Sequence, residues 1–179
     1  MIILEGPDGA GKTQLARRLS TDLNIEIEPR VVQSDMTSDI PLAEWAYAQM
    51  QEWPRKIIYD RFTTISEFIY GPLYRGDVRP GFDLKSTFTM LTRMFEEANP
   101  VVVYCMPPLN NVITNVTDDA LNIEAAPKIK GLYWLYFDRM VRDPNCLVWD
   151  YTMDKDSKHY AELLKSIKWK NWERNKLVY

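Results

Sequence analysis

Residues 6–13 place the tightest limit on how this chain can fold. Their sequence, Gly-Pro-Asp-Gly-Ala-Gly-Lys-Thr, satisfies the pattern G-x-x-x-x-G-K-[ST]. The apolar run 1–4 before them predicts a buried strand, and residues 14–19 after them are typical of an amphipathic helix. Glycines let consecutive backbone N–H groups turn toward a phosphate, and a helix N-terminus adds positive potential. The sequence therefore predicts a strand, a phosphate-binding loop and a helix in direct succession.

The motif also assigns the expected phosphate ligands by position. Lys12 is expected to reach the β- and γ-phosphates of a nucleotide, and the Thr13 hydroxyl is expected to bind Mg²⁺. The loop residues expected to surround the phosphates of ATP are Gly6, Gly9, Ala10, Gly11, Lys12 and Thr13. ATP and Mg²⁺ are therefore the predicted ligands of this segment.

Composition limits the partners of the chain. With 179 residues, of which 46% are hydrophobic, it suits one domain with a substantial core. A formal net charge of −3 gives no general attraction to nucleic acid or to an acidic membrane. Two cysteines are too few for a disulfide framework, and no apolar run approaches the roughly 20 residues of a membrane span. We expect a cytoplasmic protein without a signal peptide that binds small nucleotides, and a homodimer stays open.

Apolar strands and amphipathic helices alternate along the chain. Further strands are predicted at 25–28 with 30–32, at 56–59, at 101–105 and at 146–149. Helices are predicted at 41–52, 82–98, 128–141 and from 157 onward, whereas 71–76 is predicted to be a loop. Continuous apolar strands between helices imply a five-stranded parallel sheet covered on both faces. The expected fold is a three-layer α/β/α domain over residues 1–179.

Ligands of such sheets bind at the carboxyl ends of the strands. Asp60 and Arg61 follow the predicted strand 56–59, while Asp8 and Lys12 follow the first strand. A carboxylate can organise the hydration shell of Mg²⁺, and an arginine can bind a phosphate through two N–H groups. A solvent-exposed ion pair would also explain Asp60 and Arg61. Because a phosphate-binding loop precedes them, we favour a site.

Two segments resemble thymidylate kinases. Residues 5–13 are similar to the E-G-x-D-G-x-G-K-T loop of that family, and residues 60–62, with Ser66 and Tyr70, resemble its D-R-[YH]-x-x-S-x-x-A-Y segment. Ser66 and Tyr70 lie one residue later than the family spacing, and an isoleucine replaces the alanine. Residues 66–72 also resemble small thymidylate-kinase-like proteins of bacteriophages, and a protein encoded by a phage would be expected in the host cytoplasm. The resemblance identifies a P-loop nucleotide kinase.

The resemblance implies transfer of phosphate from ATP to a deoxynucleoside monophosphate, with dTMP or a modified pyrimidine analogue as acceptor. Asp8 would accept a hydrogen bond from the 3′-hydroxyl of that acceptor, although it could instead stabilise the turn. Arg61 would hold the acceptor phosphate, and Asp60 would support the metal or position Arg61. Lys12, Arg61 and Asp60 are thus the predicted catalytic residues, and Thr13 and Asp60 the predicted metal ligands. The predicted acceptor-binding residues are Asp8, Arg61, Phe62, Tyr70 and Arg75.

The sequence departs from the family in its lid. Thymidylate kinases carry an additional arginine in the phosphate loop or in a lid, and the lid would correspond here to residues 109–127. That segment contains no lysine or arginine and is rich in asparagine and acidic residues. The nearest later cations that could replace the arginine, each equally explained as a solvent-exposed helix charge, are Lys128, Lys130, Arg139 and Arg142.

Other functions remain open at this stage. A deoxynucleoside kinase would need a carboxylate as general base, for which Glu28 is the candidate. A kinase acting on a hydroxymethylated base in DNA would use the lysines near Trp169 and Trp172, although these fit a solvated helix face better. A protein that senses ATP without turnover is the non-enzymatic alternative.

Overall fold

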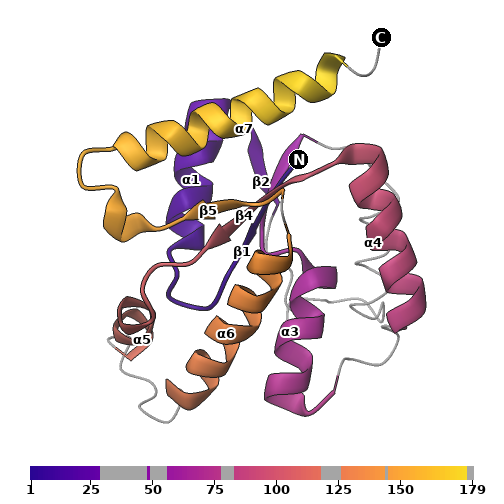
Figure 1. The fold of residues 1–179 in the computed structure, drawn as a ribbon, viewed down its shortest axis with the longest axis vertical. Helices are drawn as coiled ribbons and strands as arrows, with labels where there is room; N and C mark the ends of the chain where they lie inside the picture. The colour runs from indigo at the N-terminus through magenta and orange to yellow at the C-terminus, as the bar shows by residue number, and fades with distance from the viewer. Residues whose placement is uncertain (29–47, 49–55, 78–82, 118–125, 144, 177–179) are drawn as a thin grey trace.

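The computed structural model describes residues 1–28, 48, 56–77, 83–117, 126–143 and 145–176 (Figure 1). Its centre is a five-stranded sheet in which every pair of neighbours is parallel, in the order β2-β3-β1-β4-β5. The strands are β1 (Ile2–Glu5), β2 (Glu26–Glu28), β3 (Ile57–Asp60), β4 (Val101–Cys105) and β5 (Leu147–Trp149). The predicted parallel sheet is confirmed.

Register places the end of β1 between the ends of β3 and β4. Leu4 lies opposite Asp60 on one side and opposite Val103 on the other. The segments that follow these three strands therefore meet at one edge of the sheet, where the loop of residues 6–11 runs into the helix α1 (Lys12–Leu23).

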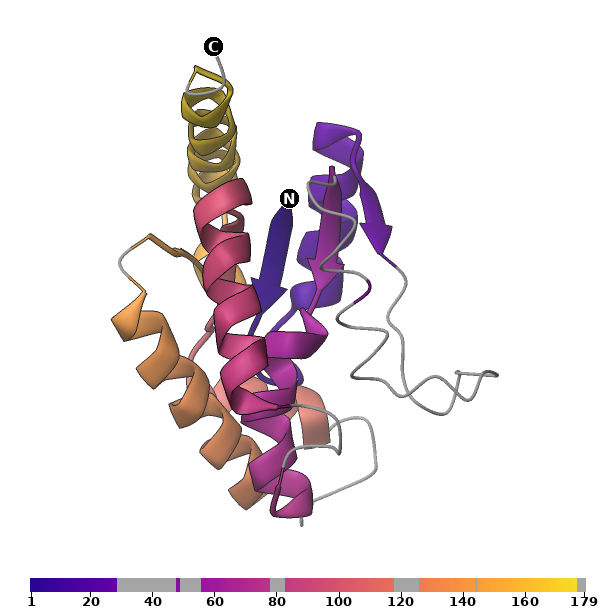
Figure 2. The ribbon, with the colours of Figure 1, turned by 90° about the vertical axis from the view of Figure 1, so that its right-hand side faces the viewer.

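Helices cover both faces of the sheet (Figures 1 and 2). The helices are α1, α3 (Thr63–Arg75), α4 (Leu84–Ala98), α5 (Leu109–Thr117), α6 (Ala126–Arg142) and α7 (Lys158–Lys176), with a short 3₁₀ turn η3 at Tyr151–Met153. Side chains of a strand alternate between its faces. Ile2 and Leu4 accordingly pack in a core with α1 and α7, whereas Ile3 packs in a second core with α3, α4 and α6. The three-layer α/β/α architecture is thus confirmed.

Several local predictions are confirmed with shifts of one or two residues at their ends. Strands form at 26–28, 57–60, 101–105 and 147–149, and helices form at 84–98, 126–142 and 158–176. In α7 the residues Tyr160, Leu163 and Ile167 are buried, as their helical spacing predicted. The predicted helix at 41–52 and the strand residues 30–32 lie outside the described residues. No helix in the described part of the chain has the length and apolar character needed to cross a membrane.

The prediction of a loop at 71–76 was wrong, because α3 continues to Arg75 and contains Pro72. Proline removes one helical N–H donor, but the next turn still closes through the Gly76 N–H on the Pro72 carbonyl at 3.1 Å. Ile65 and Ile69 bury one side of α3 against the second core. This packing outweighs the local preference of glycine and proline for a turn. Gly76, with φ of 82°, then ends the helix.

Half of the expected lid is also helical. Residues 109–117 form α5, and residues 118–125 lie outside the described part of the chain. The helix α5 lies near the loop of residues 6–11 (Figure 1), and the contacts between them are described below.

We expect Leu132→Ala to destabilise the protein by about 2–5 kcal/mol, because the Leu132 side chain is fully buried between α6 and the sheet. Leu135→Ala on the same helix is the matched control, since Leu135 is 45% exposed. Urea unfolding should show a loss of less than about 1 kcal/mol for the control. Equal losses for the two variants would contradict the described packing of α6.

Candidate active site

The loop between β1 and α1 is held by close contacts on two sides. A Cβ atom on Gly6, whose φ is 143°, would lie 2.4 Å from the carbonyl oxygen of Cys105 at the end of β4. A Cβ on Gly9, with φ of 75°, would lie 2.8 Å from the Val112 carbonyl oxygen in α5. Only glycine fits these two positions, because both the space and the backbone angle exclude a side chain. The loop is therefore enclosed between the sheet and α5.

Lys12 lies across this loop. Its ammonium donates hydrogen bonds to the carbonyl oxygens of Gly6, at 2.9 Å, and of Pro7. The side chain is buried, and burial together with the nearby Arg61 lowers the pKa of Lys12 to about 8. Its two hydrogen bonds go to neutral carbonyl oxygens, and the nearby carboxylates of Asp8 and Asp60 oppose the lowering of its pKa, so a further anion beside the ammonium would stabilise its charge. This position of Lys12 is compatible with its predicted role as a ligand of a nucleotide phosphate.

Thr13 and Asp60 face each other at the edge of the loop. The Thr13 hydroxyl, in the first turn of α1, donates to Asp60 Oδ2 at 2.6 Å at the end of β3. A hydroxyl and a carboxylate are oxygen donors of the kind that Mg²⁺ takes alongside water and phosphate oxygens. No group of three or more His, Cys, Asp or Glu side chains within the described ranges could enclose a metal ion by itself. The donor set fits an ion that is shared with a phosphorylated ligand.

Arg61 joins the loop to α3. Its guanidinium forms an ion pair with Asp8 and lies over the Tyr70 ring, with 4.6 Å between Cζ and the ring centroid. The Tyr70 hydroxyl donates to the other oxygen of Asp8 at 3.3 Å. The Arg61 side chain is only 9% exposed. Three of the five predicted acceptor-binding residues therefore lie together.

The other two predicted acceptor residues are placed differently. The Phe62 side chain is buried in the second core, where its ring meets that of Tyr59 edge-on at 5.0 Å. Arg75 is the last residue of α3, and its side chain lies outside the described part of the structure.

Glu5 is a site residue that sequence reasoning did not identify. Its carboxylate is fully buried and accepts hydrogen bonds from the Phe62 N–H at 2.9 Å and from the Tyr136 hydroxyl at 3.0 Å. Burial raises its pKa, against the opposing effect of these hydrogen bonds and of nearby Arg61. Two signals in the sequence could have found it: Glu5 is an acidic residue at the end of an otherwise apolar strand, and it matches the first position of the E-G-x-D-G-x-G-K-T pattern.

Glu5 fixes the backbone next to Arg61. Arg61 has a φ of 70°, in the left-handed region that residues with a side chain rarely adopt. Its own N–H donates to the Leu4 carbonyl oxygen at 2.9 Å, and the following N–H, of Phe62, donates to Glu5. The unusual conformation is therefore held from β1 on both sides.

Asn115 is a second residue that sequence reasoning did not single out. From α5 its side-chain amide donates to the Gly9 carbonyl oxygen and to the Tyr151 hydroxyl, both at 2.8 Å. Asn115 lies in the segment 109–127, which is rich in asparagine and contains no lysine or arginine. The amide links the phosphate loop to the segment that follows β5.

Two neighbouring cavities surround these residues. A cavity of about 440 Å³ is lined by residues 8–14 together with Asp60, Arg61 and Asn115. A second, of about 340 Å³, shares Gly11, Gln14 and Asn115 with it. The other residues that line the second cavity are Leu15, Arg18, Trp149, Tyr151 and Asp154. Arg18 and Asp154 form an ion pair at 2.6 Å on its wall. The cavity that contains Lys12, Asp60 and Arg61 is lined mainly by polar groups, and the cavity that contains Leu15 and Trp149 is more apolar.

The four candidate replacements for the lid arginine lie in different surroundings. Arg142 pairs with Asp138 on the outside of α6, and Arg139 contacts the buried Tyr104. Lys130 is exposed. Of the four, Lys128 approaches the predicted acceptor side, since its ammonium lies 5.2 Å from the Tyr74 ring. Tyr74 in turn stacks on Tyr70 with 5.7 Å between ring centroids.

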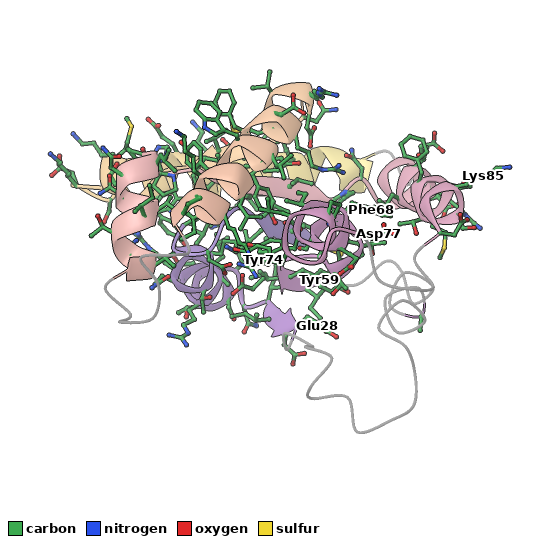
Figure 3. All side chains as sticks on the ribbon, turned by 90° about the horizontal axis from the view of Figure 1, so that it is seen from below. Glu28, Tyr59, Phe68, Tyr74, Asp77 and Lys85 are labelled. Carbon is green, nitrogen blue, oxygen red and sulfur yellow. The ribbon has the colours of Figure 1, made fainter. Side chains whose placement is uncertain are left out.

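Glu28, the candidate base of a nucleoside kinase, is the last residue of β2 and is half-buried. It lies opposite Tyr59 in the register of β2 and β3. Figure 3 looks at the molecule from below and shows Glu28 at the tip of the β2 arrow.

Comparison with known proteins shows the fold. No family model matches the chain, and no curated protein matches it by sequence. Among solved structures, the YorR protein of Bacillus subtilis in complex with phosphorylated GDP matches with a TM-score of 0.74 and 19% identity, over 95% of this chain and 96% of that one. Deoxyadenosine kinase from M. mycoides with bound dATP matches with a TM-score of 0.55 and 16% identity, over 92% and 97% of the two chains. The chain therefore has a P-loop kinase fold.

Glu5→Ala should remove the acceptor of the buried Phe62 N–H and destabilise the protein by about 1–3 kcal/mol. Amide exchange at Phe62 should also become faster. Glu5→Gln keeps an acceptor oxygen and should retain protection of this amide. Glu162→Ala, at an exposed glutamate of α7, is the control for loss of a carboxylate. Unchanged exchange at Phe62 in Glu5→Ala would contradict the assigned contact.

The pKa of Lys12 predicts a dependence of stability on pH. Burial lowers this pKa from 10.5 to about 8, so between these values the unfolded chain binds more protons than the folded one. The free energy of unfolding must then rise with pH across that window. In urea unfolding of nucleotide-free protein, wild type should gain stability relative to Lys12→Met between pH 7.5 and 9.5. Buried tyrosines are common to both proteins and cancel. A constant difference would show that Lys12 titrates normally.

Proposed function

We propose that this protein transfers the γ-phosphoryl group of ATP to the phosphate of a deoxynucleoside monophosphate, with dTMP or a modified pyrimidine analogue as acceptor. The observation that carries this proposal is the buried Arg61, which pairs with Asp8 inside the cavity that also contains Lys12. Two buried cations on one cavity suit two phosphorylated ligands better than one. The proposed enzyme is one domain of residues 1–179 with its lid at 109–127.

ATP would occupy both cavities. Its β- and γ-phosphates would lie in the loop cavity, against Lys12 and the backbone N–H groups of residues 9–13. Its base would lie in the second cavity, which Trp149 and Tyr151 line. Asn115 borders both cavities and would hold the loop in place through its hydrogen bond to the Gly9 carbonyl oxygen. Thr13 and Asp60 would hold Mg²⁺, which neutralises phosphate charge when it is bound.

The acceptor would lie on the other side of Arg61, toward α3. The guanidinium would bind the acceptor phosphate through two N–H groups and hold it in line with the γ-phosphate. Asp8, fixed by Arg61 and Tyr70, would accept a hydrogen bond from the 3′-hydroxyl. Arg75 and Tyr70 remain proposed acceptor contacts. The reaction would need no general base from the protein, because phosphoryl transfer between phosphates depends on positioning and charge neutralisation.

A deoxynucleoside kinase is the second candidate. The likeness to deoxyadenosine kinase supports it, and so does Glu28 at the end of β2, from which a carboxylate could accept the proton of a sugar hydroxyl. The carboxylate inside the phosphate loop and the buried Arg61 favour an acceptor that already carries a phosphate.

The experiment that separates these functions measures ATP consumption with each deoxynucleoside, each deoxynucleoside monophosphate and a DNA oligonucleotide with hydroxymethylated bases. Turnover with monophosphates alone supports the proposal. Turnover with free nucleosides, or with the oligonucleotide, supports the corresponding alternative. Tight ATP binding with no stimulation by any acceptor identifies a nucleotide sensor.

Arg61→Lys is expected to lower kcat/KM for dTMP by a factor of about 100 or more, because lysine keeps the charge but loses the planar two-point contact with a phosphate. Binding of ATP in the absence of acceptor should change much less. Arg93→Lys, at an exposed arginine of α4, is the matched control. Near-normal turnover of dTMP by Arg61→Lys would rule out Arg61 as the acceptor phosphate ligand.

A further inference from the structure

The helix α6 has two different faces. Leu132 and Tyr136 are buried against the sheet and α3, and Ile129 on the same side of the helix is buried as well. The opposite side, which we call the α6 outer face, carries the exposed residues Lys130, Trp134, Phe137, Asp138 and Val141. Each of these residues lies three or four positions from another of the set, so together they form one stripe along the helix. Figure 2 shows α6 along an outer edge of the molecule.

Apolar side chains dominate the α6 outer face. Trp134 is 52% exposed, Phe137 39% and Val141 65%. The Trp134 ring meets the Phe137 ring edge-on at 5.6 Å and the Tyr133 ring at 5.9 Å. An exposed aromatic cluster of this kind leaves a large apolar area in water, and such patches mark interaction surfaces. Tryptophan at the centre of a patch is also typical of interface hot spots.

The charges on this face point to its partner. We propose that the α6 outer face binds the same face of a second copy of this chain, with the two α6 helices antiparallel about a two-fold axis at Trp134. In that arrangement residues at equal distances before and after Trp134 lie opposite one another. Lys130 would then face Asp138 of the other copy, and Asp138 would face the second Lys130. One symmetric contact thus produces two ion pairs around a central pair of tryptophans.

The existing contacts permit this arrangement. Asp138 already receives a hydrogen bond from Arg142 at 2.9 Å, but its side chain is 59% exposed and keeps acceptor capacity for a lysine. One turn farther out, Pro127 would face Val141, which extends the apolar contact. The order lysine, tryptophan, aspartate is complementary to itself when two copies of the helix run antiparallel. An unrelated partner would need a separate set of charges to match it. The pattern therefore favours self-association.

The interface would leave the proposed active site open. None of the residues that line the two cavities belongs to α6. Substitutions on the α6 outer face should therefore change the oligomeric state without removing a residue that contacts nucleotide. This separates the proposal from the proposed function, because either can fail alone.

The test measures molar mass by sedimentation equilibrium over protein concentrations from about 0.1 to 100 µM. Wild type should be a dimer in the upper part of this range. Trp134→Ala, Lys130→Asp and Asp138→Lys should each weaken association at least tenfold. The double variant Lys130→Asp with Asp138→Lys should recover most of the lost affinity, because the exchanged charges again face each other. Lys165→Asp, at an exposed lysine of α7, is the control for charge reversal and should stay dimeric.

Three results would overturn the proposal. One is a wild-type protein that is monomeric at every concentration. Another is a dimer that Trp134→Ala leaves unchanged. The third is a double variant that associates no better than its two parents, which would show that Lys130 and Asp138 do not face each other across the axis. Circular dichroism of each variant confirms that the chain is folded, so that loss of the dimer reports on the interface.

Discussion

The geometry of the candidate site depends on two hydrogen bonds that hold the turn after β3 against the end of β1. The Arg61 N–H bonds to the Leu4 carbonyl oxygen, and the Phe62 N–H bonds to the buried Glu5 carboxylate. A residue with a side chain in the left-handed region costs of order 1–3 kcal/mol and persists only where its surroundings determine it. Here they do. The resulting turn directs the Arg61 guanidinium back over the phosphate loop to Asp8, while α3 starts in a different direction.

Electrostatics explain why this arrangement is suited to anions. Lys12 and Arg61 are both buried, and the nearby Arg61 contributes to the lowered pKa of Lys12. The balancing carboxylates of Asp8 and Asp60 lie at the edge of the same cavity. A phosphate bound in this cavity would add negative charge close to the two cations, whose side chains have little contact with water, and this strengthens the attraction. The same loop is kept rigid by Asn115 and by the close packing of its glycines against β4 and α5.

The helices on the two faces of the sheet support different parts of the candidate site. The face covered by α1 and α7 supports the loop from behind, with Ile2 and Leu4 of β1 in one core. The face covered by α3, α4 and α6 positions Arg61, Tyr70 and the Tyr136 hydroxyl that contacts Glu5. Since α6 presents its inner side to Glu5 and its outer side to solvent, the proposed dimer would stabilise the helix that carries Tyr136.

The sequence by itself determined the parallel sheet, the loop of residues 6–11 between β1 and α1, and the positions of Asp60 and Arg61 at the end of β3. Runs such as residues 101–105 are apolar throughout because both faces of a parallel strand are buried, and the spacing of 6–13 admits few conformations. Tertiary structure decided what depends on distant contacts. The run of α3 through Pro72, the burial of Phe62, and the roles of Glu5 and Asn115 arise from partners far away in the chain. No local sequence pattern encodes such contacts. The structural role of a buried carboxylate or of an amide donor depends on its hydrogen-bond partner, and the packing of distant segments decides which group that partner is.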